Sequence, residues 1–228
     1  MWTAAASKPA PAVADTNIPA ISLGGSSIEL EKAAINELAE GLSGEVLLSG
    51  HPAYDEVRRI WNGMHDKRPA LIARCADARD ISDAVTFARE RELLVAVRGG
   101  GHSWPGKSVC EGGLMIDLSL MNSVKVDPVE RRAFARGGAL LNALDTATRE
   151  HGLITTAGVV SHTGVGGLVT GGGFGRLARR FGLSIDNLVG VDVVTADDAG
   201  YSVGDTVKVN SEGGSRSFEL VGIAAYDD

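Results

Sequence analysis

Two glycine-rich runs constrain the fold of this chain more than any other feature of its sequence. The first lies within residues 99–113 and the second within residues 158–175. Clustered glycines mark backbone that turns sharply or approaches a ligand closely, because they carry no side chain to obstruct either. We therefore expect both runs to form loops at tight turns or against a bound ligand.

The composition limits the class of protein. The 228 residues make one full domain and part of a second, and 44% apolar with 22% charged residues is typical of a soluble globular chain. A net charge of −7 argues against nucleic acid as a partner, since a phosphate backbone needs a basic face. Cys75 and Cys110 fit neither a disulfide framework nor a metal site, so we expect two buried thiols and no bound metal.

Residues 1–25 are rich in alanine and proline and are predicted to be a disordered lead. They lack the uninterrupted apolar core of a signal peptide, and no stretch of the chain is long enough to span a membrane. The expected location is the cytoplasm.

The periodicity of apolar residues predicts helices and short strands in turn. A capping box at Ser26 and Glu29 indicates the first helix, and Asp80 is expected to cap a later one within a β–α–β unit. Helices are predicted over residues 28–40, 54–62 and 139–151, and after Asp80. Strands are predicted over residues 70–75, 93–98, 114–118, 123–126, 132–136 and 188–196, and the last of these is expected to be buried. A hairpin is predicted about residues 211–214.

The stretch GHSWPGKS, residues 101–108, matches the phosphate-loop pattern G-x-x-x-x-G-K-[ST]. Such a loop needs a helix beginning at its Lys-Ser pair, which presents backbone N–H groups to the phosphates. Gly112 and Gly113 follow too soon for a helix, because each costs about 1 kcal/mol there relative to alanine. A phosphate-loop nucleotidase is therefore the weakest alternative, and Lys107 is expected to be a solvated loop residue.

A different chemistry fits the longer stretch RGGGHS, residues 98–103, which follows a predicted strand. Its bare backbone suits contact with a pyrophosphate and holds an imidazole beside it. An imidazole nitrogen can attack the 8α-methyl group of an oxidised flavin after that methyl loses a proton. A histidine held against that edge can therefore become a covalent tether.

At this point the sequence resembles a known family. Three segments carry the resemblance: the run ending in VRGGGHSWPG, then GGLMIDLSLMNSVKVDP, then GVGGLVTGGGFGRLARRFGLSIDNLVGVDVVTAD. Together they look like the berberine-bridge-enzyme-like, FAD-linked oxidases, whose flavin-binding fold is shared with vanillyl-alcohol oxidase and p-cresol methylhydroxylase. The resemblance extends from about Gly44 to Asp197.

The resemblance implies an α+β fold, an FAD-binding PCMH-type domain over residues 26–197 made of two α/β subdomains, about 26–104 and 105–197. It implies that FAD lies between them and is bound covalently to His102. The other residues matching the family's cofactor-binding positions are Gly99, Gly100, Gly101, Ser103, Gly164, Gly166, Gly167, Gly171, Gly172, Gly173, Gly175 and Val194.

Departures from the family pattern also carry information. Plant members have a cysteine that makes a second bond to the flavin ring, and Val160 stands at that position here, with Leu168 at the position of the motif's histidine. The resemblance therefore implies a single covalent link. The remaining histidines are read as ordinary surface or core residues: His51, His65, His151 and His162.

The resemblance also implies oxidation of a CH–OH or CH–N donor (an alcohol, sugar or amine) by hydride transfer to flavin N5, with dioxygen or another acceptor receiving the electrons. In the family the substrate domain follows the strand that ends here at Asp197, and its motifs are missing, so no catalytic residue is identified. A non-catalytic or truncated flavin-binding fragment remains an alternative. Residues 198–228 weakly resemble an extracytoplasmic segment of an ABC-transporter permease. They are predicted to be an unrelated, hairpin-like tail, and this change of resemblance favours a join between two genes.

Overall fold

A four-stranded sheet forms the centre of the larger part of the molecule. The computed structural model describes residues 14–194, 206–211 and 214–219. The sheet has the order β3-β4-β6-β5, in which β4, β6 and β5 run parallel and β3 is antiparallel. Its strands are β3 (Glu45–Leu47), β4 (Leu71–Arg74), β5 (Val95–Arg98) and β6 (Leu114–Asp117). The central strands β4 and β6 are short apolar runs, as expected for strands covered on both faces.

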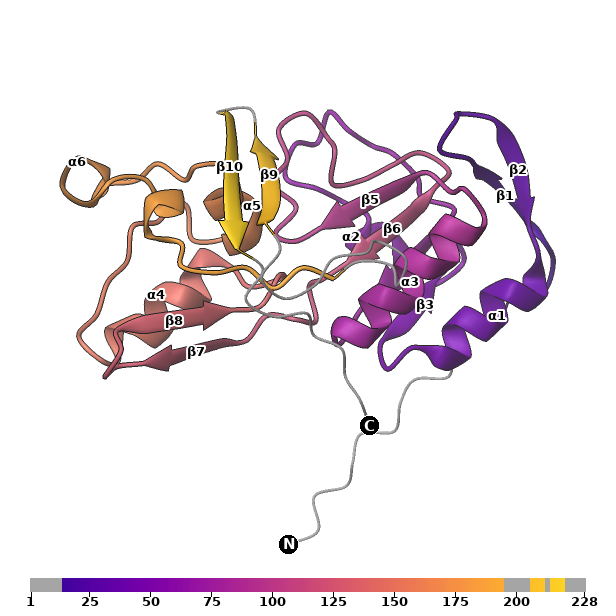
Figure 1. Ribbon diagram of the computed structural model, residues 1–228. Helices are drawn as coiled ribbons and strands as arrows, with labels where there is room; N and C mark the ends of the chain where they lie inside the picture. The colour runs from indigo at the N-terminus through magenta and orange to yellow at the C-terminus, as the bar shows by residue number, and fades with distance from the viewer. Residues whose placement is uncertain (1–13, 195–205, 212–213, 220–228) are drawn as a thin grey trace, which may run out of the picture.

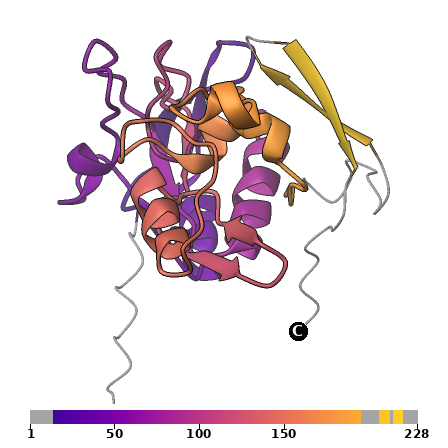
Figure 2. The same cartoon turned by 90° about the vertical axis from the view of Figure 1, so that its left-hand side faces the viewer.

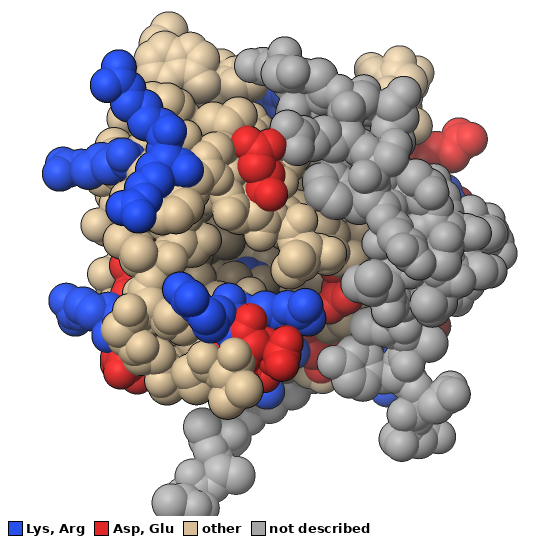
Figure 3. Space-filling model, turned by 60° about the vertical axis from the view of Figure 1, so that its left-hand side comes forward, with Lys and Arg blue, Asp and Glu red and all other residues tan. Residues whose placement is uncertain are grey.

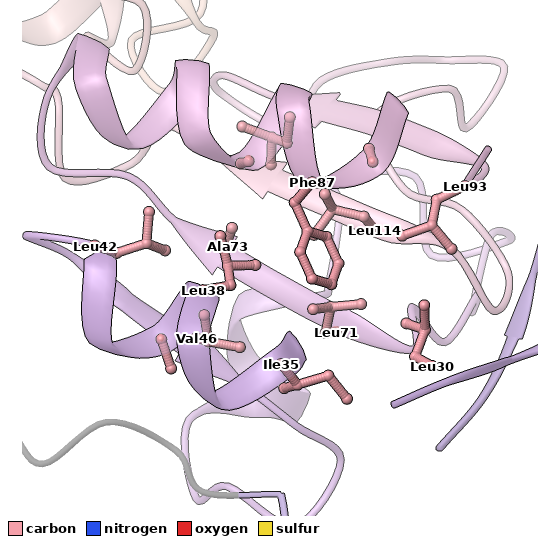
Figure 4. Close-up of a cluster of buried hydrophobic side chains, with 14 of the residues drawn as sticks. Leu30, Ile35, Leu38, Leu42, Val46, Leu71, Ala73, Phe87, Leu93 and Leu114 are labelled. Atoms are coloured by element: carbon pink, nitrogen blue, oxygen red, sulfur yellow. The ribbon is translucent and has the colours of Figure 1, made fainter. Parts of the chain in front are cut away.

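Two helices cover one face of this sheet, α1 (Lys32–Gly41) and α3 (Ala78–Glu90), as Figure 1 shows. Their apolar sides pack on β4 and β6, and Figure 4 shows Leu38, Phe87, Leu71 and Leu114 filling the space between them. The opposite face of the sheet is covered by the single-turn helix α2 (Tyr54–Val57). The β–α–β unit predicted from the sequence is present, and its second strand leads directly into the first glycine-rich run.

The N-terminal segment differs from its prediction. Residues 14–25 are not a disordered lead, because β1 (Ile18–Ile21) pairs antiparallel with β2 (Ser27–Leu30) and Ala14 is buried. Strand β2 occupies the predicted start of the first helix, so the capping box is absent and Glu31 is the N-cap. Burial of Leu30 in the core outweighs the local capping pattern. Residues 1–13 lie outside the described residues.

The start of α3 also requires a correction. Asp77 is its N-cap and accepts a hydrogen bond from the Asp80 backbone. The Asp80 carboxylate is buried and accepts from the backbone N–H groups of Ser43, Gly44 and Ala76. It therefore joins the loop before β3 to the end of β4. The predicted helix over residues 54–62 is shorter than expected and ends at Val57.

The smaller part of the molecule lies at the opposite end from β1 and β2 (Figure 1). Strands β7 (Val124–Asp127) and β8 (Arg132–Ala135) form an antiparallel ribbon against helix α4 (Leu141–Arg149). Three short helices follow, and Figure 2 shows this segment above the ribbon and α4. They are α5 (Val165–Thr170), α6 (Ala178–Phe181) and the 3₁₀ helix η1 (Ser184–Asn187).

Two further observations concern the predicted domain layout. Strand β6 lies between β4 and β5, so the first sheet extends beyond the boundary placed near residue 104. The predicted buried strand over residues 188–196 is wrong for residues 188–194, which belong to no strand and leave Val189 76% exposed. β9 (Thr206–Ser211) and β10 (Gly214–Glu219) pair antiparallel where the sequence predicts a hairpin. Among the described helices, none combines the length and apolar character needed to cross a membrane.

Candidate functional site

The two glycine-rich runs meet backbone to backbone. A Cβ atom placed on Gly100 would lie 2.3 Å from the Gly164 nitrogen, and one placed on Gly164 would lie 2.5 Å from the Gly100 nitrogen. One placed on Gly99 would lie 2.9 Å from the Gly137 carbonyl oxygen. Real Cβ contacts do not occur at such distances, so only glycine fits. The sequence separates the runs by about sixty residues, and the fold brings them together at the start of α5.

A buried ion network supports the first run where it leaves β5. Asp117, the last residue of the central strand β6, is fully buried and accepts from Arg98 Nη1 at 2.8 Å and Arg74 Nε at 3.3 Å. The Arg98 guanidinium lies directly against Gly101, which has a φ of +68°. The Gly101 carbonyl oxygen accepts from the Trp61 N–H at 2.9 Å. The loop is therefore fixed from both sides.

His102 lies at the end of this loop, half-buried among aromatic rings. Its ring stacks on Trp61 with centroids 5.3 Å apart and 17° between the planes, and the His162 ring lies 4.6 Å away at 51°. Its Nε2 is buried and has no hydrogen-bond partner in the part of the chain that the structure describes. Burial, and secondarily the charge of His162, lowers the pKa of His102 below its ordinary value. The imidazole is thus favoured in its neutral, nucleophilic form.

His162 is the residue of this site that sequence reasoning missed. Its reading as an ordinary histidine rested on the absence of any motif around it, and the sequence holds no signal for a partner sixty residues earlier. Its backbone neighbours are fixed to the start of α4, because Leu141 N–H donates to the Thr163 carbonyl and Asn142 N–H to the Ser161 carbonyl, each at 2.9 Å.

The other predicted residues of the second run have two kinds of surroundings. Gly166 and Gly167 are not crowded: a Cβ on Gly166 would be in ordinary contact with the Gly137 carbonyl oxygen at 3.5 Å, and no atom lies within 4 Å for Gly167. Gly173 and Gly175 pack tightly, on the Ser184 side chain and the Ala157 carbonyl respectively. Gly171 ends α5, and Gly172 adopts a φ of +109°.

A cavity of about 1070 Å³ lies beside these loops, between β5, β6 and α3 on one side and β8, α4 and α5 on the other. This volume is at the upper end of the range of about 300–1,000 Å³ typical of cofactor pockets. Gly137 and Gly166 line it, as does Val194, whereas His102 lies outside it. Figure 3 shows the hollow with basic and acidic side chains along its edge, and the lining includes Arg131, Arg132 and Arg136 together with Glu130 and Asp192. The three arginines outnumber the two carboxylates, and this balance of charge suits an anionic ligand.

The phosphate-loop alternative fails in the structure. No helix begins at Lys107, as predicted; its backbone N–H instead donates to Ser103 Oγ at 3.0 Å, within a loop of turns. The segment between residues 101 and 113 therefore lacks the helix N-terminus that a triphosphate site requires.

Lys107→Ala is expected to leave the flavin content of the purified chain unchanged, since this side chain is exposed to solvent. The measurement is the flavin absorbance per chain, with Lys125→Ala as a matched exposed-lysine control. Tight magnesium-dependent binding of ATP by the parent chain in calorimetry would contradict this interpretation of the loop.

The two cysteines are free and buried, as predicted. Burial raises the pKa of both thiols, that of Cys110 to about 11. Neither is therefore a thiolate nucleophile at neutral pH. No group of three or more potential ligands in the described residues is arranged to hold a metal ion.

Comparison with known proteins identifies the family. A family model described as an FAD binding domain matches residues 69–200, which include both glycine-rich runs, β5, β6 and the cavity-lining loops. This chain belongs to the FAD binding domain family. The match ends at residue 200, before β9 and β10.

Relatives of this FAD-binding domain are oxidases and related proteins. It is 38% identical over 163 residues to (R)-6-hydroxynicotine oxidase of Paenarthrobacter nicotinovorans, covering 71% of this chain and 36% of the relative. It is 30% identical to berberine bridge enzyme-like 21 of Arabidopsis thaliana, and the match covers 75% of this chain and 34% of the relative. The crystal structure of 6-hydroxy-D-nicotine oxidase from Arthrobacter nicotinovorans superposes with a TM-score of 0.66 at 32% identity, over 78% of this chain and 36% of that one. The chain thus spans about a third of the length of these relatives.

The residues present fit FAD. Gly100 and Gly164 bring the two glycine-rich runs into direct backbone contact, Gly167 leaves free space beside it, and arginine side chains line the adjacent cavity. The unpartnered, buried Nε2 of His102 adds a polar atom that the described chain itself does not satisfy. A buried polar atom without a partner is costly, so its presence is itself a sign of a ligand.

Proposed function

We propose that this chain is the FAD-binding part of a flavin-dependent oxidoreductase and that His102 is the residue to which FAD is covalently attached. The observation that carries the proposal is the position of His102. Its imidazole follows a loop whose backbone meets the second glycine-rich run, within a domain of an FAD-binding family. Its lowered pKa supports a neutral nucleophile there.

The chain's own residues have distinct tasks in this proposal. Backbone N–H groups of the glycines at 99–101, 166 and 167 would hold the pyrophosphate, since no side chain stands in their way. Arg132 and Arg136 would balance its negative charge, and Val194 lies in the lining of the same cavity. Trp61 restricts the orientation of the His102 ring by stacking on it. The bound flavin would supply the capacity to accept a hydride.

The substrate is proposed to be a small molecule with an oxidisable CH–N or CH–OH bond, and the electron acceptor to be dioxygen or another oxidant. The relative named (R)-6-hydroxynicotine oxidase supports a CH–N donor. Valine at position 160, where plant relatives carry a cysteine, supports attachment through His102 alone.

The test is to supply the chain with FAD and precipitate it with acid. We expect yellow colour to remain in the pellet, and a digest to show one FAD-modified peptide containing His102. His102→Ala should lose the acid-stable flavin, whereas the exposed His151→Ala should retain it. Acid-stable flavin on Cys110, or its persistence in His102→Ala, would refute covalent attachment at His102; a parent chain that binds no FAD would refute the function itself.

A further inference from the structure

The pair formed by His102 and His162 has no role in the site as described so far. Their ring centroids lie 4.6 Å apart, closer than either ring lies to another described aromatic ring in the cluster. His162 is held there by the two backbone hydrogen bonds that fix residues 161 and 163 to the start of α4. The packing of the two parts of the molecule therefore fixes the backbone on each side of His162, and its exposed side chain lies against the His102 ring.

We propose that His162 is a positioning residue that keeps the imidazole of His102 unprotonated, and so ready to form its bond to FAD. This inference rests on the proposed covalent attachment at His102 and assigns a task to a second histidine.

The physical basis is the contact between the two rings, in surroundings where His102 is half-buried. Burial disfavours a proton on His102, and charge on the neighbouring His162 disfavours it further; both effects lower the pKa of His102. The neighbouring charged groups are engaged elsewhere. Arg98 is paired with Asp117, and Lys67 Nζ donates to the Gly106 and Val109 carbonyls.

Two more titratable groups lie near the loop. His65 Nε2 lies 3.1 Å from the Trp104 carbonyl oxygen, and Lys107 is exposed. Neither contributes to the shift in the pKa of His102, which has burial and His162 as its causes. His162 is therefore the side chain whose charge can be changed to test the inference.

The bond-forming step shows why protonation matters. In covalent attachment, a free lone pair on an imidazole nitrogen of His102 would form the N–C bond to the 8α carbon; the methyl carbon would lose one proton and the imidazole its N–H proton. The flavin would retain the two electrons, and dioxygen would take them up with these two protons to give hydrogen peroxide. An imidazolium has no free lone pair, so the rate depends on the neutral fraction of His102.

The experiment measures the pKa of His102 by NMR titration of the flavin-free chain, with three substitutions at position 162. His162→Phe keeps a ring of similar size without charge, His162→Gln keeps polarity, and His162→Glu reverses the charge. We expect the pKa of His102 to rise in the phenylalanine and glutamine variants and to rise most in the glutamate variant. His151→Phe, at an exposed site, should leave it unchanged, and unaltered backbone spectra would show that each variant folds.

The same variants are then supplied with FAD over a range of pH. A rise of one unit in the pKa of His102 should slow covalent attachment about tenfold below that pKa. The rate should recover at pH 8.5, where His102 is neutral in every variant. Equal slowing at all pH values would show that His162 only fills space and would overturn the inference.

A pKa of His102 that is the same in the parent, His162→Phe and His162→Glu would also overturn it. This titration needs no flavin, so it decides the inference even where the attachment experiment refutes the proposed function. Conversely, FAD attached to His102 with an unshifted pKa would leave the proposed function intact and remove only the task assigned to His162.

Discussion

Asp117→Ala is expected to lower the free energy of unfolding of the chain by about 3–5 kcal/mol, the cost typical of removing one partner from a buried ion network. Asp117 is fully buried, and its carboxylate accepts from Arg98, Arg74 and the Ser119 hydroxyl. Alanine would leave the Arg98 guanidinium without its carboxylate partner and Arg74 with Glu45 as its remaining partner, although each arginine side chain is about four-fifths buried.

The measurement is urea unfolding monitored by circular dichroism, at constant protein concentration. Glu29→Ala is the matched control, an exposed carboxylate on β2 whose removal should change stability by no more than about 0.5 kcal/mol. Asp117→Asn should fall between the two, because it keeps the shape and an acceptor oxygen but not the charge. A loss below about 1 kcal/mol for Asp117→Ala would show that the network contributes little.

Flavin binding should weaken in the same variant, since Arg98 is the support against which Gly101 packs. This links the stability of the central sheet to the geometry of the first glycine-rich run. The link was not visible in the sequence, where Asp117 is the last residue of the apolar run LMID.

Features set by neighbouring residues could be predicted from the sequence. The β–α–β unit, the turn after β5 and the absence of a helix at Lys107 each follow from patterns within about thirty consecutive residues, and the structure confirms them. The resemblance to FAD-linked oxidases also rested on ordered motifs, and the family match confirms it. The cofactor-binding roles of individual glycines stay predictions.

Features set by contacts distant in the sequence could not be predicted. Strand β6 inserts between β4 and β5 although it follows both, because parallel pairing is chosen by packing and not by sequence order. The apolar run after residue 188 reads as a buried strand, yet a strand needs a pairing edge. In the described residues β7 and β8 pair only with each other, and residues 188–194 are not added to their ribbon as a third strand. These residues line the cavity instead.

The same difference between local and distant contacts explains which residues of the candidate site could be predicted. Its loop and His102 were found because one local motif contains both. His162 and Trp61 were missed because each reaches His102 from another segment, about sixty and forty residues away, and a lone histidine or tryptophan carries no sign of its partner. The capping box failed for a related reason: Ser26 and Glu29 match the pattern, but the burial of Leu30 decides the local structure.

Gly100→Ala is expected to lower FAD occupancy at least about tenfold and to destabilise the chain by about 1–3 kcal/mol, the usual cost of overpacking. Its new methyl group would lie 2.3 Å from the nitrogen and 2.4 Å from the Cα of Gly164. Both are backbone atoms, so no side-chain rotation relieves the clash. The two glycine-rich runs must move apart, and the backbone N–H groups proposed to hold the pyrophosphate move with them.

Two other glycine substitutions separate binding from folding. Gly41→Ala, at the end of α1 and with no atom within 4 Å of its new methyl group, should preserve both stability and FAD occupancy. Gly167→Ala also has free space and lies within α5, where alanine is the better helix former, so stability should hold or rise. Its methyl group would enter the space proposed for the cofactor, and occupancy should fall. Titration with FAD by fluorescence quenching, beside thermal unfolding, distinguishes the three variants. Wild-type occupancy in Gly100→Ala would mean that the meeting of the two runs does not form the FAD site.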